Sequence, residues 1–321
     1  MISIYKSVEE QNASLQKEQN ASLQKLENIE PGCWINAVAP SEQELLYISR
    51  KTGAPLEFLK ASLDEEETSR IDTEKNITLF VVDIPFTEME DNSLTYDTYP
   101  LAIIHTEKEI ITVCLKNSKI FSDFVEGKVK SFFTFKRSRF ILQILFRIAS
   151  YYLLYLKQID KKIFMIEKKL YKSMRNKELL QLLSLEKSLF YFSTSLTSNE
   201  MTLEKMLKME MMQKYPEDKD VLEDVITENK QAIEMANIYS NVLGTTMDAF
   251  ASIISNNLNI VMKFLAAITI VISIPNMIFG AFGMNVPVPM ASYPLAFGYI
   301  WAIAIGACIL VLLILKKRNI L

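Results

Sequence analysis

The sequence has few of the residues that build most metal, nucleotide and disulfide sites. Its 321 residues include one histidine, His105, which excludes a site with several histidines within one chain. The three cysteines, Cys33, Cys114 and Cys308, lie far apart and form no CxxC pair, which argues against a zinc ribbon or a disulfide framework. The eight glycines form neither a GxGxxG fingerprint nor a P-loop. No paired catalytic groups occur in a recognisable motif, so we expect no enzymatic activity.

Charge is missing from one long stretch of the chain. No Asp, Glu, Lys, Arg or His occurs between Phe264 and Leu315, although the chain has 35 Lys and Arg and 38 Asp and Glu residues. A soluble domain spreads charge over its surface, so the chain divides into a charged part and a charge-free end. The net charge of −3 argues against nucleic-acid binding. The first residues lack the apolar run of a signal peptide, so we expect the charged part to stay in the cytosol.

The charge-free end has the length of two membrane spans. A span needs about 20 apolar residues, and residues 260–282 and 295–315 each supply one. The loop between them, residues 283–294, contains three prolines and is predicted to lie outside the membrane. The tail, residues 316–321, carries Lys316, Lys317 and Arg318, and basic residues beside a span favour the cytoplasmic side. Both termini are therefore expected in the cytoplasm. The alternative, a helical hairpin buried in a soluble core, would need an unusually large core.

The first predicted span carries a stripe of mostly small or polar residues. With spacings of three and four, the stripe follows one helix face and consists of Asn259, Met262, Ala266, Thr269, Ser273, Asn276 and Gly280. A polar side chain in hydrocarbon needs a partner or water. The stripe fits a seam where helices pack closely. It equally fits the wall of a water-filled pore. Because two spans cannot enclose a pore, the second interpretation requires several copies of the chain.

The charged part is predicted to contain long helices. From Lys128 to Ile274 the chain has one proline, Pro216, and one glycine, Gly244. A coiled-coil-like apolar seam is formed by Leu156, Ile159, Ile163, Ile166 and Leu170. After Pro216 the pattern predicts one helix from about Glu217 to Phe282. Such a helix is about 100 Å long, and it would begin in the cytosol and continue into the membrane.

The N-terminal third is predicted to be α/β. Runs of β-branched and aromatic residues predict strands at 33–38, 77–82, 99–104 and 110–114. Ser41 and Glu44 have the spacing of a capping box, which predicts the start of a short helix. The heptapeptide QNASLQK occurs twice, at residues 11–17 and 19–25. Because it is polar and repeated only twice, we interpret it as a solvated insertion rather than a functional element.

Several motifs of the C-terminal end together resemble the CorA family of divalent-cation transporters. The tripeptide Gly283-Met284-Asn285 closes the first span, the segment NIVMKFL at residues 259–265 opens it, and the basic tail ends the chain. The resemblance extends to the cytosolic part and so covers nearly the whole chain. It implies a homopentamer in the cell (inner) membrane. Its parts would be an α/β cytosolic funnel domain (residues 1–130), a long-helix stalk (131–258) and a transmembrane pore domain (259–321).

The resemblance also implies a function and a set of site residues. Members of the family carry Mg²⁺, and also Co²⁺ or Ni²⁺, by channel-like flow without ATP. Gly283, Met284 and Asn285 would form the selective outer mouth, and the stripe, together with Leu265, would line the pore. Met262 and Leu265 would form an apolar constriction that closes by dewetting. The resemblance thus favours the pore interpretation of the stripe, with Mg²⁺ as the transported and regulatory ion.

Gating in the family uses divalent ions bound between cytosolic subunits. Asp248 matches the stalk aspartate of the family, eleven residues before Asn259. In an ungapped alignment its usual acidic partner on a neighbouring subunit is replaced by Ala61. The nearby acidic run could substitute, and it consists of Asp64, Glu65, Glu66 and Glu67; a solvated helix end is an equally good interpretation of this run. A second departure is the outer loop, which has no carboxylate after Asn285.

Two other functions stay open at this point. The same fold in a related branch of the family transports Zn²⁺, although the stripe offers no Cys or His for tight Zn²⁺ binding, which favours Mg²⁺. A membrane-anchored signalling protein would use the long helix to relay ligand binding, and it would need no polar face in the membrane. Measurement of divalent-ion flux in liposomes separates the three.

Overall fold

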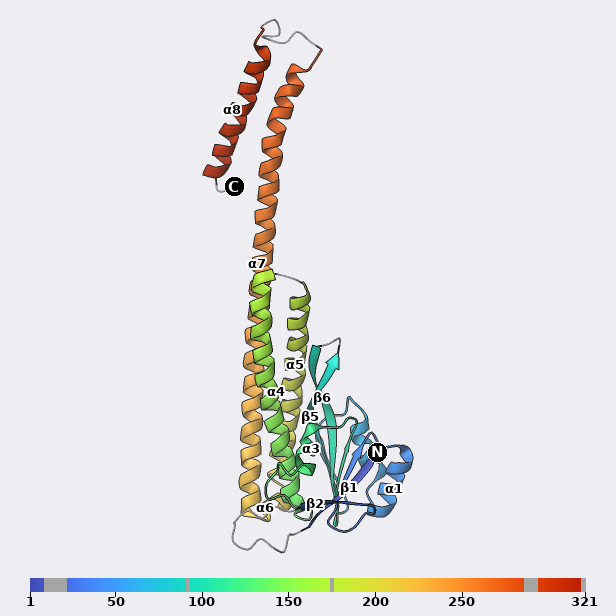
Figure 1. The fold of residues 1–321 in the computed structure, drawn as a ribbon. Coiled ribbons are helices and arrows are strands. Elements are labelled where there is room, and N and C mark those ends of the chain that lie inside the picture. The colour runs from blue at the N-terminus through green and yellow to red at the C-terminus, as the bar shows by residue number, and fades with distance from the viewer. Residues whose placement is uncertain (9–21, 91–92, 174–175, 286–293, 319–321) are drawn as a thin grey trace. The chain divides into compact units, whose positions relative to one another are not determined.

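The chain forms two compact units in the computed structural model. The structure describes residues 1–8, 22–90, 93–173, 176–285 and 294–318, and its units are Met1–Thr245 and Thr246–Leu321 (Figure 1). The first QNASLQK copy, the start of the second and most of the expected outer loop fall outside these ranges. The last residues of the second copy belong to a strand at the edge of the sheet, so this end of the repeat is part of the fold and not only a solvated insertion.

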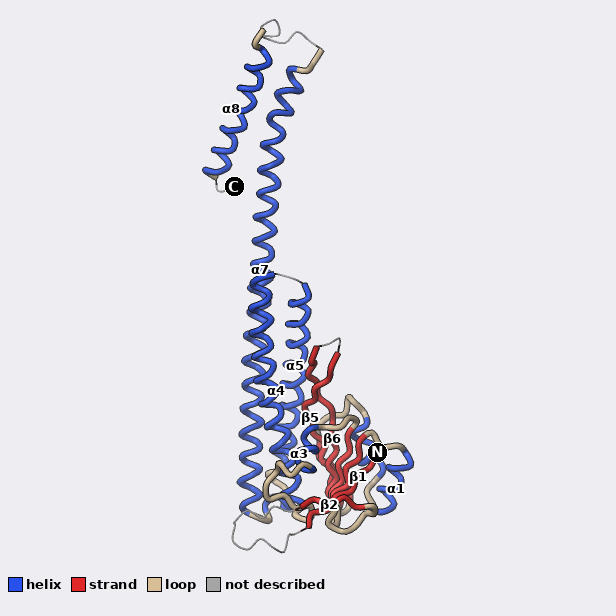
Figure 2. The backbone as a smooth tube through the Cα atoms, viewed as in Figure 1, coloured by secondary structure: helices blue, strands red, loops and turns tan. Residues whose placement is uncertain are grey.

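Unit 1 contains a seven-stranded sheet. Its strands are β1 (Ile2–Val8), β2 (Ser22–Leu26), β3 (Trp34–Val38), β4 (Arg70–Glu74), β5 (Ile77–Glu90), β6 (Ser93–His105) and β7 (Ile110–Cys114). They lie in the order β2-β1-β3-β7-β6-β5-β4. β3 and β7 pair in parallel, and every other neighbouring pair is antiparallel. Figure 2 shows the strands of the sheet in red beside the long helices. The four strands expected from the sequence are confirmed, and three further strands, β1, β2 and β4, were not predicted.

Helices cover both faces of this sheet. On one face, α1 (Glu42–Thr52), α2 (Leu56–Lys60) and the 3₁₀ turn η1 (Ala61–Leu63) bury apolar side chains against the strands, including Leu45, Ile48 and Leu59. The capping box that opens α1 is confirmed: the Glu44 N–H donates to Ser41 Oγ at 3.3 Å, and the Ser41 N–H donates to the Glu44 carboxylate at 2.8 Å. Those hydrogen bonds satisfy amides that the first turn of a helix otherwise leaves free.

An aromatic cluster around Trp34 forms the core on the other face. Trp34 is fully buried, and its indole N–H donates to Thr112 Oγ1 at 2.9 Å. The rings packed around it are Tyr5, Phe121, Phe124, Phe132 and Phe140. Phe121 and Phe124 lie on α3 (Lys119–Val125), and Phe140 lies on α4 (Arg137–Ser173). A buried indole with a satisfied N–H therefore joins the sheet to the first long helix.

Three long helices pack together beside the sheet. They are α4, α5 (Asn176–Met206) and the first part of α7 (Pro216–Phe282), and the short α6 (Glu210–Gln213) precedes α7 (Figure 1). Arg139 of α4 donates to Asp218 of α7 at 3.3 Å, and Ser193 of α5 donates to Asn237 of α7 at 2.7 Å. The predicted apolar seam of α4 is confirmed, since all five of its side chains are buried.

Unit 2 consists of the rest of α7 and of α8 (Ala296–Lys317). The prediction of one helix from about Glu217 to Phe282 is confirmed within one residue. The two helices meet through small residues, since Ala267 of α7 and Ala304 of α8 are 0% and 2% exposed. The ring centroids of Phe279 and Trp301 lie 5.4 Å apart. Small side chains at these positions let the helix backbones approach closely.

Candidate functional site

Three helices of the described chain are long and apolar enough to cross a membrane, judged by length and composition. They are α4, α7 and α8. The most apolar stretch of α4 is 61% buried inside the protein, whereas those of α7 and α8 are 6% and 11% buried. The apolar surface of α4 is thus already covered by the sheet and its neighbouring helices. The apolar surfaces of α7 and α8 still need an environment that covers them.

The sequence-predicted stripe lies on an exposed face of α7. All seven stripe residues are exposed, and the structure places them along one helix as expected from their spacing. The face toward α8 is a different one: there Ala267 is fully buried, and the Val271 carbonyl accepts from the Cys308 thiol at 3.7 Å. The stripe therefore does not serve the contact between the two helices of one chain.

The hydroxyl groups of the stripe are oriented as acceptors. Thr269 Oγ1 donates to the Leu265 carbonyl at 2.8 Å, and Ser273 Oγ donates to the Thr269 carbonyl at 2.7 Å. Each hydroxyl hydrogen is engaged within the helix, so the oxygen lone pairs face outward. A hydrated cation presents the hydrogens of its water shell, and acceptor oxygens can bind that shell. Met262 and Leu265, by contrast, expose apolar side chains, at 59% and 52%.

The tripeptide Gly283-Met284-Asn285 directly follows the end of α7. The Gly283 N–H donates to the Phe279 carbonyl at 2.9 Å, which continues the helical turn. A Cβ atom at this position would lie 3.1 Å from the same carbonyl oxygen, a close contact that glycine avoids. Met284 and Asn285 are exposed. Glycine thus lets the chain leave α7 tightly and present Asn285 just beyond the helix end.

The acidic run is solvent-exposed at three of its four positions. Asp64 accepts from the Glu66 N–H at 3.1 Å, and Glu67 forms an ion pair with Arg70. Ala61, which aligns with the usual acidic partner, is buried at 6% exposure in the core beneath α1 and α2. A carboxylate there would be cut off from water. The run that follows it, in contrast, exposes three carboxylates of unit 1 to solvent.

Asp248 is exposed on α7, and its backbone carbonyl accepts from Ser252 Oγ at 3.0 Å. Across the ranges that the structure describes, no three His, Cys, Asp or Glu side chains of one chain come together as a metal site. The basic residues Lys316 and Lys317 end α8, and Arg318 follows as its cap, all exposed.

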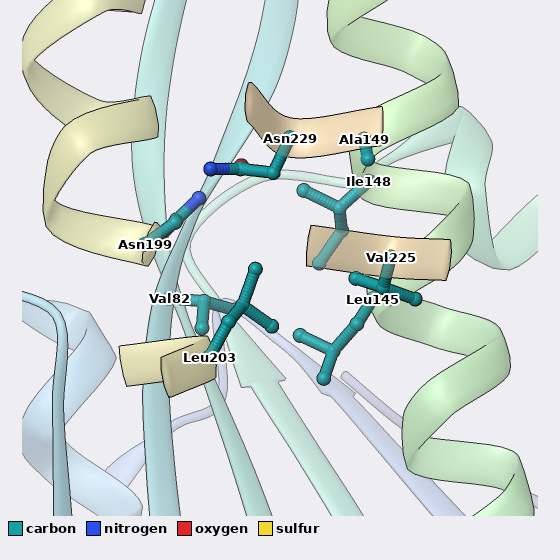
Figure 3. Close-up of a pocket in the computed structure, with 8 residues that line it drawn as sticks. All are labelled: Val82, Leu145, Ile148, Ala149, Asn199, Leu203, Val225 and Asn229. Atoms are coloured by element: carbon teal, nitrogen blue, oxygen red, sulfur yellow. The ribbon is translucent and has the colours of Figure 1, made fainter. Parts of the chain in front are cut away.

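A small cavity lies between β5, α4, α5 and α7 in unit 1 (Figure 3). It measures about 10 Å³, space for about one water molecule, and is lined by Val82, Leu145, Ile148, Ala149, Asn199, Leu203, Val225 and Asn229. Both of its amides are engaged, Asn199 with the backbone of Asp83 and Asn229 with the Leu196 carbonyl. The cavity is too small and too apolar to bind a substrate.

Asp83 and His105 are among the titratable groups of unit 1 that have shifted pKa values. Burial raises the pKa of Asp83 from 3.8 to about 6, and a hydrogen bond from Ser195 opposes the shift. Burial lowers the pKa of His105 to about 4, helped by the positive charge of Arg137. The one histidine of the chain is thus neutral at physiological pH, held at the end of β6. Neither group belongs to the exposed face of α7.

One contact of unit 2 was not predicted from the sequence. Cys308 of α8 donates to the carbonyl of Val271, four residues before Pro275. A proline within a helix always leaves the carbonyl four residues earlier without its usual donor. Pro275 in the first predicted span therefore predicts a free carbonyl at Val271. A donor on the second span, such as the Cys308 thiol, could have been sought for it.

Comparisons with known proteins agree on one family. A family model described as CorA-like Mg²⁺ transporter protein matches residues 30–317. The cobalt/magnesium transport protein CorA of Methanocaldococcus jannaschii is 26% identical over 296 residues, which cover 89% of this chain and 90% of that protein.

Solved structures share the fold. The complete structure of the CorA magnesium transporter from Methanocaldococcus jannaschii superposes with a TM-score of 0.80 at 23% identity, over 99% of this chain and 98% of that chain. The cytoplasmic domain of ZntB from Vibrio parahaemolyticus superposes with a TM-score of 0.56 at 10% identity, over 73% of this chain and 94% of that chain. At these identities the likeness shows the fold alone.

Proposed function

The chain belongs to the CorA family of divalent-cation transporters, and from that premise we propose that it conducts hydrated Mg²⁺ through a pore lined by α7. The observation that carries the proposal is the exposed stripe of α7, which faces away from α8 and leads to Asn285. Among the residues that the structure describes, no other element covers this stripe of small residues and acceptor oxygens, since all seven of its members are exposed. In several copies arranged around an axis, it would line a wetted path.

The assembly that suits this path is a homopentamer in the cell membrane, as in the family. Each chain would contribute two spans, residues 260–282 and 295–315, and α4 would stay in the cytosolic part because its apolar surface is already buried. The basic residues that end α8 would lie on the cytoplasmic side, and so would both termini. Met262 and Leu265 would form the apolar constriction near the cytosolic end, where Asn259 lies just before them.

Mg²⁺ fits the chemistry of the proposed pore wall. This ion sheds its water reluctantly, so neutral oxygens that bind the hydration shell suit passage better than a cage of carboxylates. A ring of Asn285 carboxamides at the mouth would supply such oxygens, followed by Asn276, Ser273 and Thr269. Co²⁺ or Ni²⁺ could follow the same path. A Zn²⁺ transporter of this fold is the alternative, and the stripe lacks the Cys or His ligands that bind Zn²⁺ tightly.

Gating is proposed to depend on Mg²⁺ bound between cytosolic subunits. Asp248 of one chain and an acid of the run Asp64–Glu67 of its neighbour would share the ion. When the ion leaves, the carboxylates repel one another and the subunits separate, which opens the constriction. At high Mg²⁺ the ion returns and the pore closes.

Flux through reconstituted liposomes tests the proposal, with Mg²⁺, Co²⁺ and Zn²⁺ measured in parallel. Wild type should admit Mg²⁺, and Asn285→Ala should lower the flux at least tenfold because the mouth loses its carboxamide ring. Asn256→Ala, the same change outside the stripe, is the matched control and should conduct as wild type does. Asp248→Ala should conduct but lose its inhibition by high Mg²⁺. Absence of divalent flux, with Asn285→Ala indistinguishable from wild type, would favour the signalling alternative. A preference for Zn²⁺ over Mg²⁺ would favour the Zn²⁺ transporter.

A further inference from the structure

Pro275 leaves one backbone carbonyl of α7 without its usual hydrogen-bond donor. The helix runs without a break from Pro216 to Phe282, and Pro275 lies inside it. Because proline has no N–H, the Val271 carbonyl has no donor four residues later. In water this carbonyl could bind solvent. In hydrocarbon an unsatisfied carbonyl costs several kcal/mol, and helices with an interior proline persist there only when another group satisfies the freed carbonyl.

The thiol of Cys308 lies at that carbonyl. Cys308 Sγ is 3.7 Å from the Val271 oxygen, a distance suited to a sulfur donor, and the thiol is free and half-buried. The ring contact between Phe279 and Trp301 confirms the antiparallel register of the two helices. In this register Ala304 falls opposite Pro275, and it is 2% exposed. One helical turn after Ala304 on α8, Cys308 thus places a donor at the carbonyl that the proline ring leaves free.

We propose that Cys308 is a positioning residue for the first span: its thiol replaces the missing Pro275 N–H at the Val271 carbonyl and ties the proline-containing turn of α7 to α8. The thiol is suited to this place because it fits between closely packed helices as a small apolar group and still carries one donor. The hydrogen bond itself does not depend on what the protein transports.

The consequence for ion flow rests on the proposed function. Ser273 and Asn276 lie on either side of Pro275 in the sequence, and both belong to the exposed stripe. The turn that Cys308 tethers is therefore the turn that sets where these two polar side chains point. Without the tether, they would spend less time in the arrangement that accepts a hydrated cation.

Infrared spectroscopy of the full-length protein tests the hydrogen bond directly. The difference between wild type and Cys308→Ala isolates the S–H stretching band of Cys308 from the bands of Cys33 and Cys114. The band should lie below the frequency of an alkane thiol in hydrocarbon solvent, since hydrogen bonding weakens the S–H bond. A band at the frequency of the unbonded thiol would overturn the proposal.

A double-mutant cycle then tests the replacement. In Pro275→Ala the new N–H serves the Val271 carbonyl, so the thiol becomes redundant. Cys308→Ala should lower Mg²⁺ flux about threefold when Pro275 is present, the size expected for one hydrogen bond between membrane helices. It should change nothing measurable in the Pro275→Ala background. Cys308→Ser keeps a donor and should conduct as wild type does.

The outcomes separate this proposal from the proposed function. An equal effect of Cys308→Ala in both backgrounds, or a failure of Cys308→Ser to restore flux, would overturn the positioning role. A wild-type protein that conducts no divalent ion would reject the proposed function instead. In that case the infrared band still shows whether the hydrogen bond exists. The same double-mutant cycle can then be read from the thermal unfolding midpoints of the four proteins instead of from flux.

Discussion

Helices α4 and α8 differ in how much of their apolar surface the protein buries. Both are long and apolar enough to span a membrane, yet the apolar stretch of α4 is 61% buried within the protein and that of α8 is 11% buried. Unit 1 supplies α4 with a sheet, an aromatic cluster and two helix neighbours. Unit 2 supplies α8 with a single contact face on α7. Enough length and hydropathy for a span therefore do not by themselves assign a helix to the membrane, because the protein can cover the same apolar surface itself.

The largest expected effect comes from a charge placed in the buried face of α4. Ile144 of α4 is fully buried, so Ile144→Asp places a carboxylate without a partner in the core and should cost about 4 kcal/mol or more of the stability of unit 1. Emission from Trp34 reports the loss in a Trp301→Phe background, because exposure to water shifts it to the red. Leu154→Asp, the same new charge at a position of α4 that is 46% exposed, should leave the emission native. Equal unfolding by both variants would contradict the assignment of α4 to the core.

The matched change on the membrane side should act differently. Ile309 of α8 is 53% exposed, so Ile309→Asp would place a charge in lipid at a cost of about 3–4 kcal/mol for insertion. The expected result is a smaller fraction of protein that resists alkaline extraction from membranes, with native Trp34 emission. Ile309→Leu is the control and should insert as wild type does. Full insertion of the aspartate variant would show that this face of α8 does not contact lipid.

The smallest expected effect concerns the pH dependence of stability at Asp83, which lies beside the buried helix α4. The Tyr152 hydroxyl of α4 donates to the Asp83 backbone carbonyl at 3.2 Å, and burial raises the pKa of the Asp83 carboxyl to about 6. Because this pKa lies above its unfolded value of 3.8, the folded state binds the proton more tightly. The contribution of Asp83 to stability is therefore greatest below pH 4, falls as the pH rises to about 6, and is constant above that.

Replacement of Asp83 by asparagine removes this dependence. Asp83→Asn should raise the stability of unit 1 by about 1–3 kcal/mol at pH 7, and the gain should vanish below pH 4. Thermal unfolding, followed by Trp34 emission at pH 7 and below pH 4, measures the stability gain under both conditions. Asp97→Asn, the same change on the neighbouring strand β6, serves as the comparison. A gain that is the same at both pH values would mean that Asp83 does not titrate near pH 6.

The parts of the fold that sequence reasoning found are those with a strong local pattern. β7, with every residue buried, matched its predicted range, and the long helix α7 was placed within one residue. Three strands were missed. β4 reads RIDTE and β2 reads SLQKL, and both lie at edges of the sheet, whereas β1 reads ISIYKSV and lies between β2 and β3. An edge strand has a partner on one side only and keeps polar residues toward water. Its existence depends on the neighbour that it pairs with, which the local sequence does not contain.

The sequence by itself determined the charge-free end, the helical period of the stripe and the tripeptide Gly283-Met284-Asn285 beyond it. These are local properties, because 3.6 residues per turn place every third or fourth side chain on one face whatever surrounds the helix. The tertiary structure alone decided that the apolar surface of α4 is core, that Ala61 is buried, and that the Cys308 thiol meets the carbonyl freed by Pro275. Each of these depends on which surfaces come together, and residues far apart in the chain settle that only by packing.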